Sequence, residues 1–307
     1  MSTKRFLLTG SSGFIGTSLV RNLDAKRIPM VTLSRSRTQG TGPEHVWDPY
    51  AARPMTHPSN LEGVQAAVHL SGANVSGRRW TPAYRREILE SRVKPTHALA
   101  TLLAGLKTKP EVLVCASAIG IYGDRGNEVL SEDSPPGCDF LAEVCAEWEY
   151  AAQPARDAGI RVVHTRFGVV LSPNGGALKQ MLPVFRCGLG GPLGSGRQWV
   201  SWITLADAIR AIEFAVERPS LFGAVNVASP NPVMNREFAR ALGRALHRPA
   251  ILPAPAMALR MMFGEMAQST ILASQRVMPA KLTAAGFEFG SPEIAGAFGE
   301  VLSPAGE

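Results

Sequence analysis

A stretch with regularly spaced glycines near the start of the chain constrains the fold most. Residues 5–16 read Arg-Phe-Leu-Leu-Thr-Gly-Ser-Ser-Gly-Phe-Ile-Gly. The apolar run that opens it is typical of a buried parallel strand, because both faces of such a strand are covered. Gly10 allows a sharp turn, Gly13 lets a phosphate approach the backbone, and Gly16 lets the following helix pack closely on the strand. A helix that begins at Phe14 would then present free N–H groups to phosphates.

The spacing G-x-x-G-x-x-G is one residue longer in its first gap than G-x-G-x-x-G, and glycine triplets alone are weak signals. Its place between a strand and a helix supports a dinucleotide site, and a purely structural turn is the alternative. The residues assigned to this site are Gly10, Ser11, Gly13, Phe14, Ile15 and Gly16.

Length and composition indicate a globular protein. The 307 residues can bury a large core, and 45% hydrophobic and 19% charged residues are ordinary values for a globular chain. The four cysteines form no C-x-x-C pair, and no signal peptide precedes the first strand, so a reducing, cytoplasmic setting is expected. The apolar segment Ala256 to Met278 is interrupted by Arg260, Glu265 and Arg276, which favours a buried helix over a membrane span.

The net charge of +7 fits nucleic acid, a membrane surface or a phosphorylated small molecule. The basic residues are dispersed, with no run of five. We therefore expect anionic small ligands and an ordinary surface, with neither nucleic acid nor a membrane as partner.

Strand and helix signals alternate through the first half of the chain, which predicts βαβ units and a parallel sheet. We expect residues 1–168 to form a doubly wound dinucleotide-binding domain whose sheet is completed by residues 223–228. Residues 169–307 would form a smaller, interleaved substrate-side domain. The expected strands are 6–8, 29–33, 45–47, 66–70, 112–116 and 161–165, and the expected helices are 15–23, 84–106, 140–158 and 235–246.

A second cofactor signal stands at the end of the second strand, where the chain reads Ser34-Arg35-Ser36-Arg37. An NAD site usually offers an acid about 20 residues past the glycines, to hold the ribose 2′-hydroxyl. Here two arginines replace it, and a planar guanidinium matches the 2′-phosphate of NADP. The residues therefore favour NADP, and two exposed loop arginines are the alternative.

Several longer motifs extend over nearly the whole chain. They include residues 69–73 (His-Leu-Ser-Gly-Ala), 117–123 (Ser-Ala-Ile-Gly-Ile-Tyr-Gly), 166–171 (Arg-Phe-Gly-Val-Val-Leu) and the Gly-rich run 190–199, with Trp148-Glu149 and residues 274–279. With the glycine fingerprint, they make the chain resemble the extended short-chain dehydrogenase/reductases. It resembles most the atypical subgroup labelled nucleoside-diphosphate-sugar epimerase-like.

This resemblance implies a Rossmann-type doubly wound α/β fold with a small C-terminal substrate domain, and an NADP site beyond the glycines. It also implies that a homodimer, if one forms, pairs the two long helices 84–106 and 140–158. For Glu87 and Arg92, spacing alone favours an ordinary solvated helix face. The additional residues that the resemblance assigns to NADP are Ser34, Arg35, Leu70, Ser71, Glu87, Arg92 and Val169.

The usual acid–base pair of these enzymes is missing. The mainstream family uses Tyr-x-x-x-Lys on the helix after the fifth strand, where the Lys lowers the Tyr pKa. The corresponding positions here are Phe140 and Val144. Phenylalanine cannot exchange a proton, and valine cannot lower a pKa.

Other groups could carry the chemistry. Ser117 stands five residues before Tyr122, where active members place a Ser or Thr four before, and a strand-end serine that caps backbone is the alternative. Tyr122 is a second candidate phenol, with a packed aromatic as its alternative. Glu143 and Cys145 are weaker candidates on the same helix. The six histidines show no zinc-binding spacing, so no metal is expected.

Two functions follow from these observations. The first is an NADP-dependent oxidoreductase or epimerase acting on a small polar substrate, nucleotide-linked substrates included. The second is an NADP-binding sensor or scaffold that has lost catalysis. The missing Tyr and Lys support the second, and the retained substrate-side motifs support the first.

Overall fold

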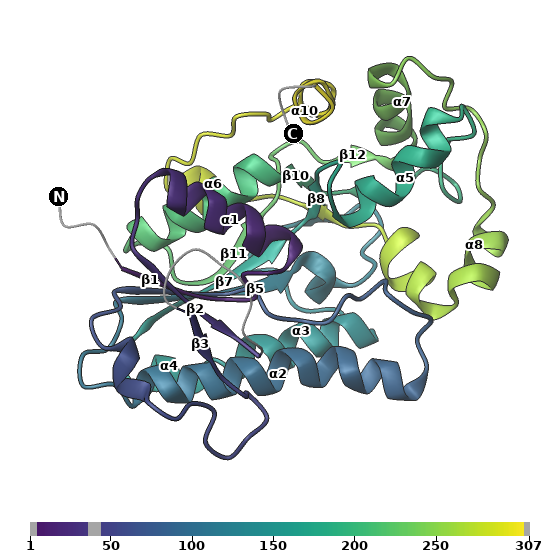
Figure 1. Cartoon of the computed structure of the whole chain (residues 1–307). Helices are drawn as coiled ribbons and strands as arrows, with labels where there is room; N and C mark the ends of the chain where they lie inside the picture. Colours follow the sequence, from purple (N-terminus) through teal and green to yellow (C-terminus); the bar gives the residue numbers. More distant parts are fainter. Residues whose placement is uncertain (1–4, 36–43, 304–307) are drawn as a thin grey trace.

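A parallel sheet of seven strands forms the centre of the molecule (Figure 1). The computed structural model describes residues 5–35 and 44–303. The strand order is β11-β7-β5-β4-β1-β2-β3, and every pairing is parallel. The strands are β1 (Phe6–Thr9), β2 (Met30–Ser34), β3 (Glu44–Val46), β4 (Ala66–His69), β5 (Val112–Ala118), β7 (Arg161–Phe167) and β11 (Gly223–Val227).

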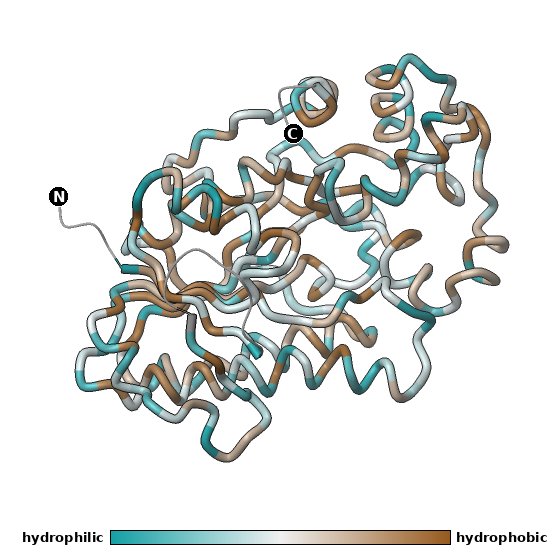
Figure 2. Tube along the Cα trace, viewed as in Figure 1, coloured by the Kyte–Doolittle hydropathy of each residue, from teal (hydrophilic) through white to brown (hydrophobic). Residues whose placement is uncertain are grey.

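Helices cover both faces of this sheet. The helices α1 (Phe14–Ala25) and α6 (Leu205–Glu217) pack on one face, and α2 (Pro82–Ala104), α3 (Phe140–Tyr150) and α4 (Gln153–Asp157) lie on the other. Alternate residues of each strand enter the two cores: Leu8 faces α1, and Leu7 faces α2. Figure 2 shows the resulting concentration of hydrophobic residues along the central strands. The predicted Rossmann-type doubly wound fold is confirmed.

A second, smaller core lies beyond the carboxyl end of the sheet. We call residues 172–200 and 229–303 the C-terminal lobe. Its core joins α5, α7 and α10, and the rings of Phe238 and Phe298 meet edge to face at 5.1 Å. The elements here and in the connections are η1 (Pro58–Leu61), η2 (Ile119–Tyr122), β6 (Val129–Leu130), β8 (Val169–Leu171), α5 (Gly176–Arg186), β9 (Trp199–Val200), β10 (Trp202–Thr204), β12 (Val233–Met234), α7 (Asn235–Ala245), α8 (Ala256–Phe263), η3 (Ala267–Ile271), β13 (Arg276–Val277), α9 (Ala280–Ala284) and α10 (Ile294–Val301).

The expected helix over residues 140–158 is wrong as a single element. It ends at Tyr150 and restarts at Gln153, with Pro154 in the first turn of α4. Proline has no N–H to donate and its ring collides with the carbonyl four residues earlier, so it suits a helix start better than a helix interior.

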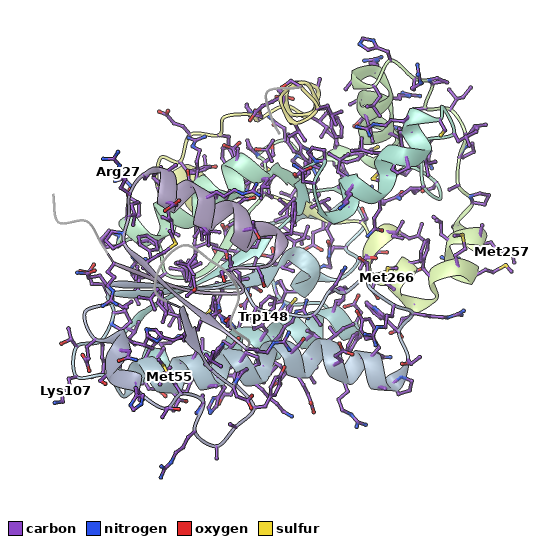
Figure 3. All side chains as sticks on the ribbon, in the orientation of Figure 1. Arg27, Met55, Lys107, Trp148, Met257 and Met266 are labelled. Atoms are coloured by element: carbon purple, nitrogen blue, oxygen red, sulfur yellow. The ribbon has the colours of Figure 1, made fainter. Side chains whose placement is uncertain are left out.

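The expected buried helix over residues 256–278 is also wrong. The α8 helix ends at Phe263, where Gly264 adopts a positive φ of 63°. Only Leu259 of this short helix is buried, and Met257 projects away from the body of the molecule (Figure 3). The segment returns to the protein interior at Met266, which is 5% exposed. High apolar content therefore did not mean burial along this segment.

Candidate functional site

The glycine loop forms a close-fitting turn between β1 and α1. Gly10 has a φ of 72°, and a Cβ there would lie 2.7 Å from the Leu70 carbonyl carbon. A Cβ on Gly16 would lie 2.1 Å from the Gly10 oxygen, so only glycine allows this helix to approach the loop. The N-terminus of α1 has no side-chain cap, and its first N–H groups stay available for an anion.

The position of this loop in the sheet is the one at which α/β folds bind ligands. The chain runs from β1 outward to β2 and then crosses to β4 on the other side of β1. The point between β1 and β4 is thus a topological switch, and ligands bind outside the carboxyl ends of the strands there. The glycine loop and the β4 exit at Leu70 and Ser71 meet at this edge, and contact of these two residues with a cofactor stays a prediction.

Side-chain hydrogen bonds fix the segment that follows β4. Thr9 Oγ1 and His69 Nδ1 lie 2.6 Å apart inside the sheet, and the Ser71 hydroxyl donates to Thr9 Oγ1 at 3.2 Å. Farther along the loop, the guanidinium of Arg92 donates to the Ala73 carbonyl at 2.9 Å. These contacts fix the backbone that runs past the glycine loop.

Arg92 is a buried support for this loop. It is 8% exposed and stacks over the Trp148 ring at 5.1 Å, so the solvated helix face suggested by spacing is wrong for this residue. Glu87 is exposed on α2 and faces Arg78 at 3.9 Å, which agrees with a solvated face. Val169 begins β8, where its N–H donates to the Ser201 carbonyl at 2.8 Å. Direct contact of Glu87 or Val169 with a cofactor stays a prediction.

The end of β2 carries the residues expected beside the adenosine. Ser34 is the last residue of the strand, its carbonyl accepts from Trp47 N–H at 3.0 Å, and Arg35 is exposed directly after it. Ser36 and Arg37 lie outside the described residues. The exposed guanidinium of Arg35 follows a strand adjacent to β1, on the same edge as the glycine loop.

The positions that would hold the Tyr–Lys pair lie in an apolar cluster. Phe140 and Val144 pack among Trp80, Ile88 and Met266, and the Phe140 ring meets the Trp80 ring edge to face at 5.1 Å. Met266 belongs to the C-terminal lobe, so this cluster also joins the two parts of the chain. Neither position can transfer a proton.

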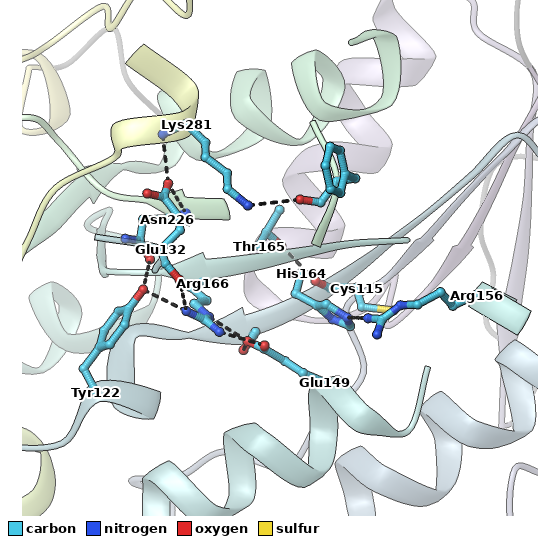
Figure 4. A network of polar contacts seen from close by, with 12 residues as sticks. Cys115, Tyr122, Glu132, Glu149, Arg156, His164, Thr165, Arg166, Asn226 and Lys281 are labelled. Carbon is cyan, nitrogen blue, oxygen red and sulfur yellow. Dashed lines mark hydrogen bonds and ion pairs between the residues drawn. The ribbon is translucent and has the colours of Figure 1, made fainter. Parts of the chain in front are cut away.

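The hydroxyls of Ser117 and Tyr122 belong to a buried polar network. Figure 4 shows Tyr122 with Arg166, Glu149 and Asn226. Ser117 donates to Glu149 Oε1 at 2.7 Å, and Glu149 forms a two-pronged ion pair with Arg166 at 2.8 and 2.9 Å. The Tyr122 hydroxyl donates to Asn226 Oδ1 at 2.7 Å and accepts from Arg166 at 2.9 Å. Ser117 is 3% exposed and Tyr122 is 0% exposed. This geometry favours the packed-aromatic alternative for Tyr122, whereas Ser117 bonds a carboxylate and does not cap backbone. A catalytic role for either residue stays a prediction.

The charges of this network stabilise one another. Burial would raise the pKa of Glu149, but the hydrogen bonds and charge of Arg166 outweigh that effect and hold the pKa below its usual value. Burial would lower the pKa of Arg166, and Glu149 raises that pKa instead. Burial also raises the pKa of Tyr122, which makes its phenol a poorer acid than usual. The network therefore holds a fixed charge pair and a neutral phenol.

The two weaker candidates lie apart from each other. Glu143 is exposed in the first turn of α3, and Cys145 is 3% exposed against η2. Burial raises the pKa of the Cys145 thiol to about 12, so it is neutral near pH 7. No group of His, Cys, Asp and Glu in residues 5–35 and 44–303 could hold a metal ion. No helix in those ranges is long and apolar enough to cross a membrane.

Sequence reasoning gave no role to Glu149, Arg166, Asn226 or Glu132. Trp148-Glu149 and Arg166 occur in the sequence motifs, but the motifs do not indicate a role for them. The signal that could have found them is charge inside apolar elements, since Arg166 interrupts a strand that is otherwise covered on both faces.

The fold and the carboxyl edge of the sheet define a Rossmann-type α/β protein with a dinucleotide-binding loop. Residues 6–228 match the NAD dependent epimerase/dehydratase family, and residues 254–301 match a domain of unknown function. The chain belongs to the NAD dependent epimerase/dehydratase family.

Relatives match over nearly the full length of the chain. An epimerase family protein of Mycobacterium bovis, Mb2239, is 42% identical over 294 residues, which cover 95% of each chain. The human epimerase family protein SDR39U1 is 35% identical, and the match covers 97% of this chain and 100% of the human one. A crystal structure of human SDR39U1 (isoform 2) with NADPH superposes with a TM-score of 0.89 at 35% identity, covering 97% of this chain and 98% of that one.

Proposed function

We propose that this protein is an NADP(H)-dependent oxidoreductase that acts on a small polar substrate, nucleotide-linked substrates included. The observation that carries the proposal is the glycine cradle at the switch point, with an arginine directly after β2. A Cβ at Gly10 or Gly16 would collide with the backbone of Leu70 or Gly10, so the close turn that leads into the uncapped start of α1 requires glycine at both positions. The human relative crystallised with NADPH supports the choice of cofactor.

Different residues of this chain would bind different parts of the cofactor. The N–H groups at the start of α1 would hold the pyrophosphate, and Arg35 with Ser34 would hold the adenosine 2′-phosphate. Leu70 and Ser71 would border the cofactor where β4 ends, and Arg92 would keep that border in place through its bond to Ala73. When bound, the nicotinamide would supply the hydride chemistry.

A sensor or scaffold that binds NADP(H) without turnover is the second candidate. The apolar packing of Phe140 and Val144 favours it, because no proton can move at those positions. The same packing weighs against epimerisation. Oxidising a sugar hydroxyl requires a base at the reacting centre, whereas reduction of an acceptor by hydride needs only a proton source.

Turnover assays separate the two candidates. NADPH absorbance would be followed with nucleotide sugars, free sugars and carbonyl compounds, alongside calorimetric titration of NADPH. Gly16→Ala should lose binding, because its Cβ would collide with Gly10. Gly296→Ala has no atom within 4 Å of the added carbon and should bind as wild type.

Oxidation of NADPH by any acceptor, lost in Gly16→Ala and kept in Gly296→Ala, would support the oxidoreductase. NADPH binding without turnover across the panel would support the sensor. Absence of NADPH binding would refute both.

A further inference from the structure

The excess positive charge of the protein is concentrated in one part of the C-terminal lobe. Residues 172–200 and 229–264 contain eight Lys and Arg residues and a single acid, Glu237, a difference of seven. The whole chain has 32 basic and 25 acidic residues, so 24 of each remain elsewhere. The net positive charge of the chain is therefore carried by these two segments, and the rest of the chain has no net charge.

These basic side chains are available to a partner. On α7 and just after it, Arg240, Arg244 and Arg248 are exposed, and Arg260 is exposed on α8. None of the eight forms a salt bridge within the residues that the structure describes. Glu237, the single acid, accepts the Met234 N–H at the start of α7.

Large apolar side chains are exposed in the same region. Met257, Met261 and Met262 on α8 are 75%, 72% and 66% exposed, and Ile251 in the preceding connector is 77% exposed. Leu252 and Leu189 are exposed beside them. Monomeric proteins rarely leave so many neighbouring apolar groups in water, and such patches mark interaction sites.

Hydrogen bonds connect the segments that carry these charged and apolar groups. Arg248 donates to the Arg186 carbonyl at 2.9 Å, which joins the ends of α7 and α5. Leu252 N–H donates to the Gly190 carbonyl at 3.2 Å, which lays the connector along the chain that follows α5. The connector then leads directly into α8, along the outer edge of the molecule (Figure 1). We call this surface the basic edge.

We propose that the basic edge docks on a membrane surface rich in anionic lipid headgroups. Charge complementarity carries the choice of partner, since arginines are attracted to anionic headgroups and the bilayer interface accepts neighbouring apolar side chains. Nucleic acid would match the arginines but leave the methionines in water. The proposal does not depend on turnover of NADPH, and it departs from the expectation that dispersed charge makes an ordinary surface.

Vesicle binding tests this proposal with the full chain. Vesicles of phosphatidylcholine containing about a third phosphatidylglycerol would be sedimented with the protein, beside vesicles of phosphatidylcholine alone. We expect binding to the anionic vesicles only. Raising salt from about 0.1 M to about 1 M shortens the Debye length from roughly 10 Å to roughly 3 Å and should release the protein.

Two sets of variants locate the contact. The triple variant Met257→Ser, Met261→Ser, Met262→Ser should bind the anionic vesicles at least about tenfold more weakly, because it removes the inserting groups. Its matched control, Phe222→Ser with Tyr150→Ser, removes exposed rings elsewhere and should bind as wild type.

Neutralising Arg240, Arg244 and Arg248 to Gln should also weaken binding about tenfold or more. Arg53→Gln with Arg86→Gln and Lys107→Gln removes equal charge outside the basic edge and should have little effect. An unchanged circular dichroism spectrum and urea unfolding midpoint would show that each variant is folded, which keeps this test separate from the proposed function.

Three outcomes would overturn the proposal: no binding to anionic vesicles, equal loss in the control variants, or tighter binding to duplex DNA than to vesicles. A dimer in sedimentation that the methionine variant abolishes would assign the basic edge to a second copy of the chain instead.

Discussion

At the scale of single residues, the predicted cofactor site depends on glycines that leave no room for a Cβ and on one arginine. Gly10 and Gly16 matter because a Cβ would collide with backbone, which cannot move away. Arg35 matters because it stands where an acid would otherwise hold a ribose hydroxyl. Arg35 is exposed at the end of β2, and its contact with a phosphate is a prediction.

Replacing Arg35 should change cofactor preference. A charge-assisted hydrogen bond contributes roughly 1.5–3 kcal/mol, which corresponds to about 10- to 100-fold in affinity. Wild type should bind NADP(H) at least about tenfold more tightly than NAD(H), and Arg35→Asp should lose most of that preference. Titration of both cofactors by calorimetry measures it.

The control for this change is Lys107→Asp, which makes the same change of charge before β5, at the opposite edge of the sheet. Equal affinities for both cofactors in wild type would show that the residues at the end of β2 do not bind the 2′-phosphate. An Arg35→Asp variant that keeps the preference for NADP(H) would show the same.

At the scale of elements, the buried network joins β5, β7 and α3 beneath the carboxyl edge. Glu149 on α3 contacts Ser117 of β5 and Arg166 of β7. Asn226 of β11 extends the network to the Met278 carbonyl at 3.0 Å. Glu132 accepts the N–H groups of Asn226 and Lys281, each at 3.1 Å. The network therefore attaches the start of α9 to the sheet.

Arg166→Met should destabilise the protein strongly. It leaves the Glu149 carboxylate buried without its cation, and breaking a buried pair in this way costs about 3–5 kcal/mol. Urea unfolding monitored by circular dichroism would measure the loss. The double variant Arg166→Met, Glu149→Leu removes both charges and should recover much of the stability. A single variant as stable as wild type would mean that the pair is solvated in solution.

At the scale of the whole molecule, stability depends on histidines buried in the sheet. His69 of β4 is 0% exposed and His164 of β7 is 2% exposed. Burial lowers the pKa of each to about 4, from 6.5. Between these values the unfolded chain binds more protons than the folded one, so the free energy of unfolding decreases as pH falls.

Stability should therefore decline from about pH 6.5 and reach its full loss from these groups near pH 4. One pKa unit corresponds to about 1.4 kcal/mol, so each histidine accounts for up to roughly 3 kcal/mol. Urea unfolding at pH 7 and pH 5 would measure the difference. His164→Gln should reduce it, whereas His57→Gln at an exposed position should not. A wild type equally stable at both pH values would contradict this account.

Much of the fold could be predicted because its signals are local. Apolar runs marked the strands, and the glycine spacing marked the turn at Gly10 and the start of α1. The resemblance to the family also predicted that Phe140 and Val144 replace the Tyr–Lys pair. The network around Glu149 was not, because Ser117 and Arg166 meet through the pairing of β5 with β7, and Glu149 reaches both from the separate helix α3.

The sequence by itself determined the phosphate-binding turn, since glycine sterics and strand periodicity act over a few residues. Only the tertiary structure decided which charged side chains are buried and which are exposed. Arg92 and Arg166 are inside the protein, whereas Arg240, Arg248 and Arg260 are exposed. A charge's surroundings depend on elements brought together from distant parts of the chain, and no local pattern encodes them.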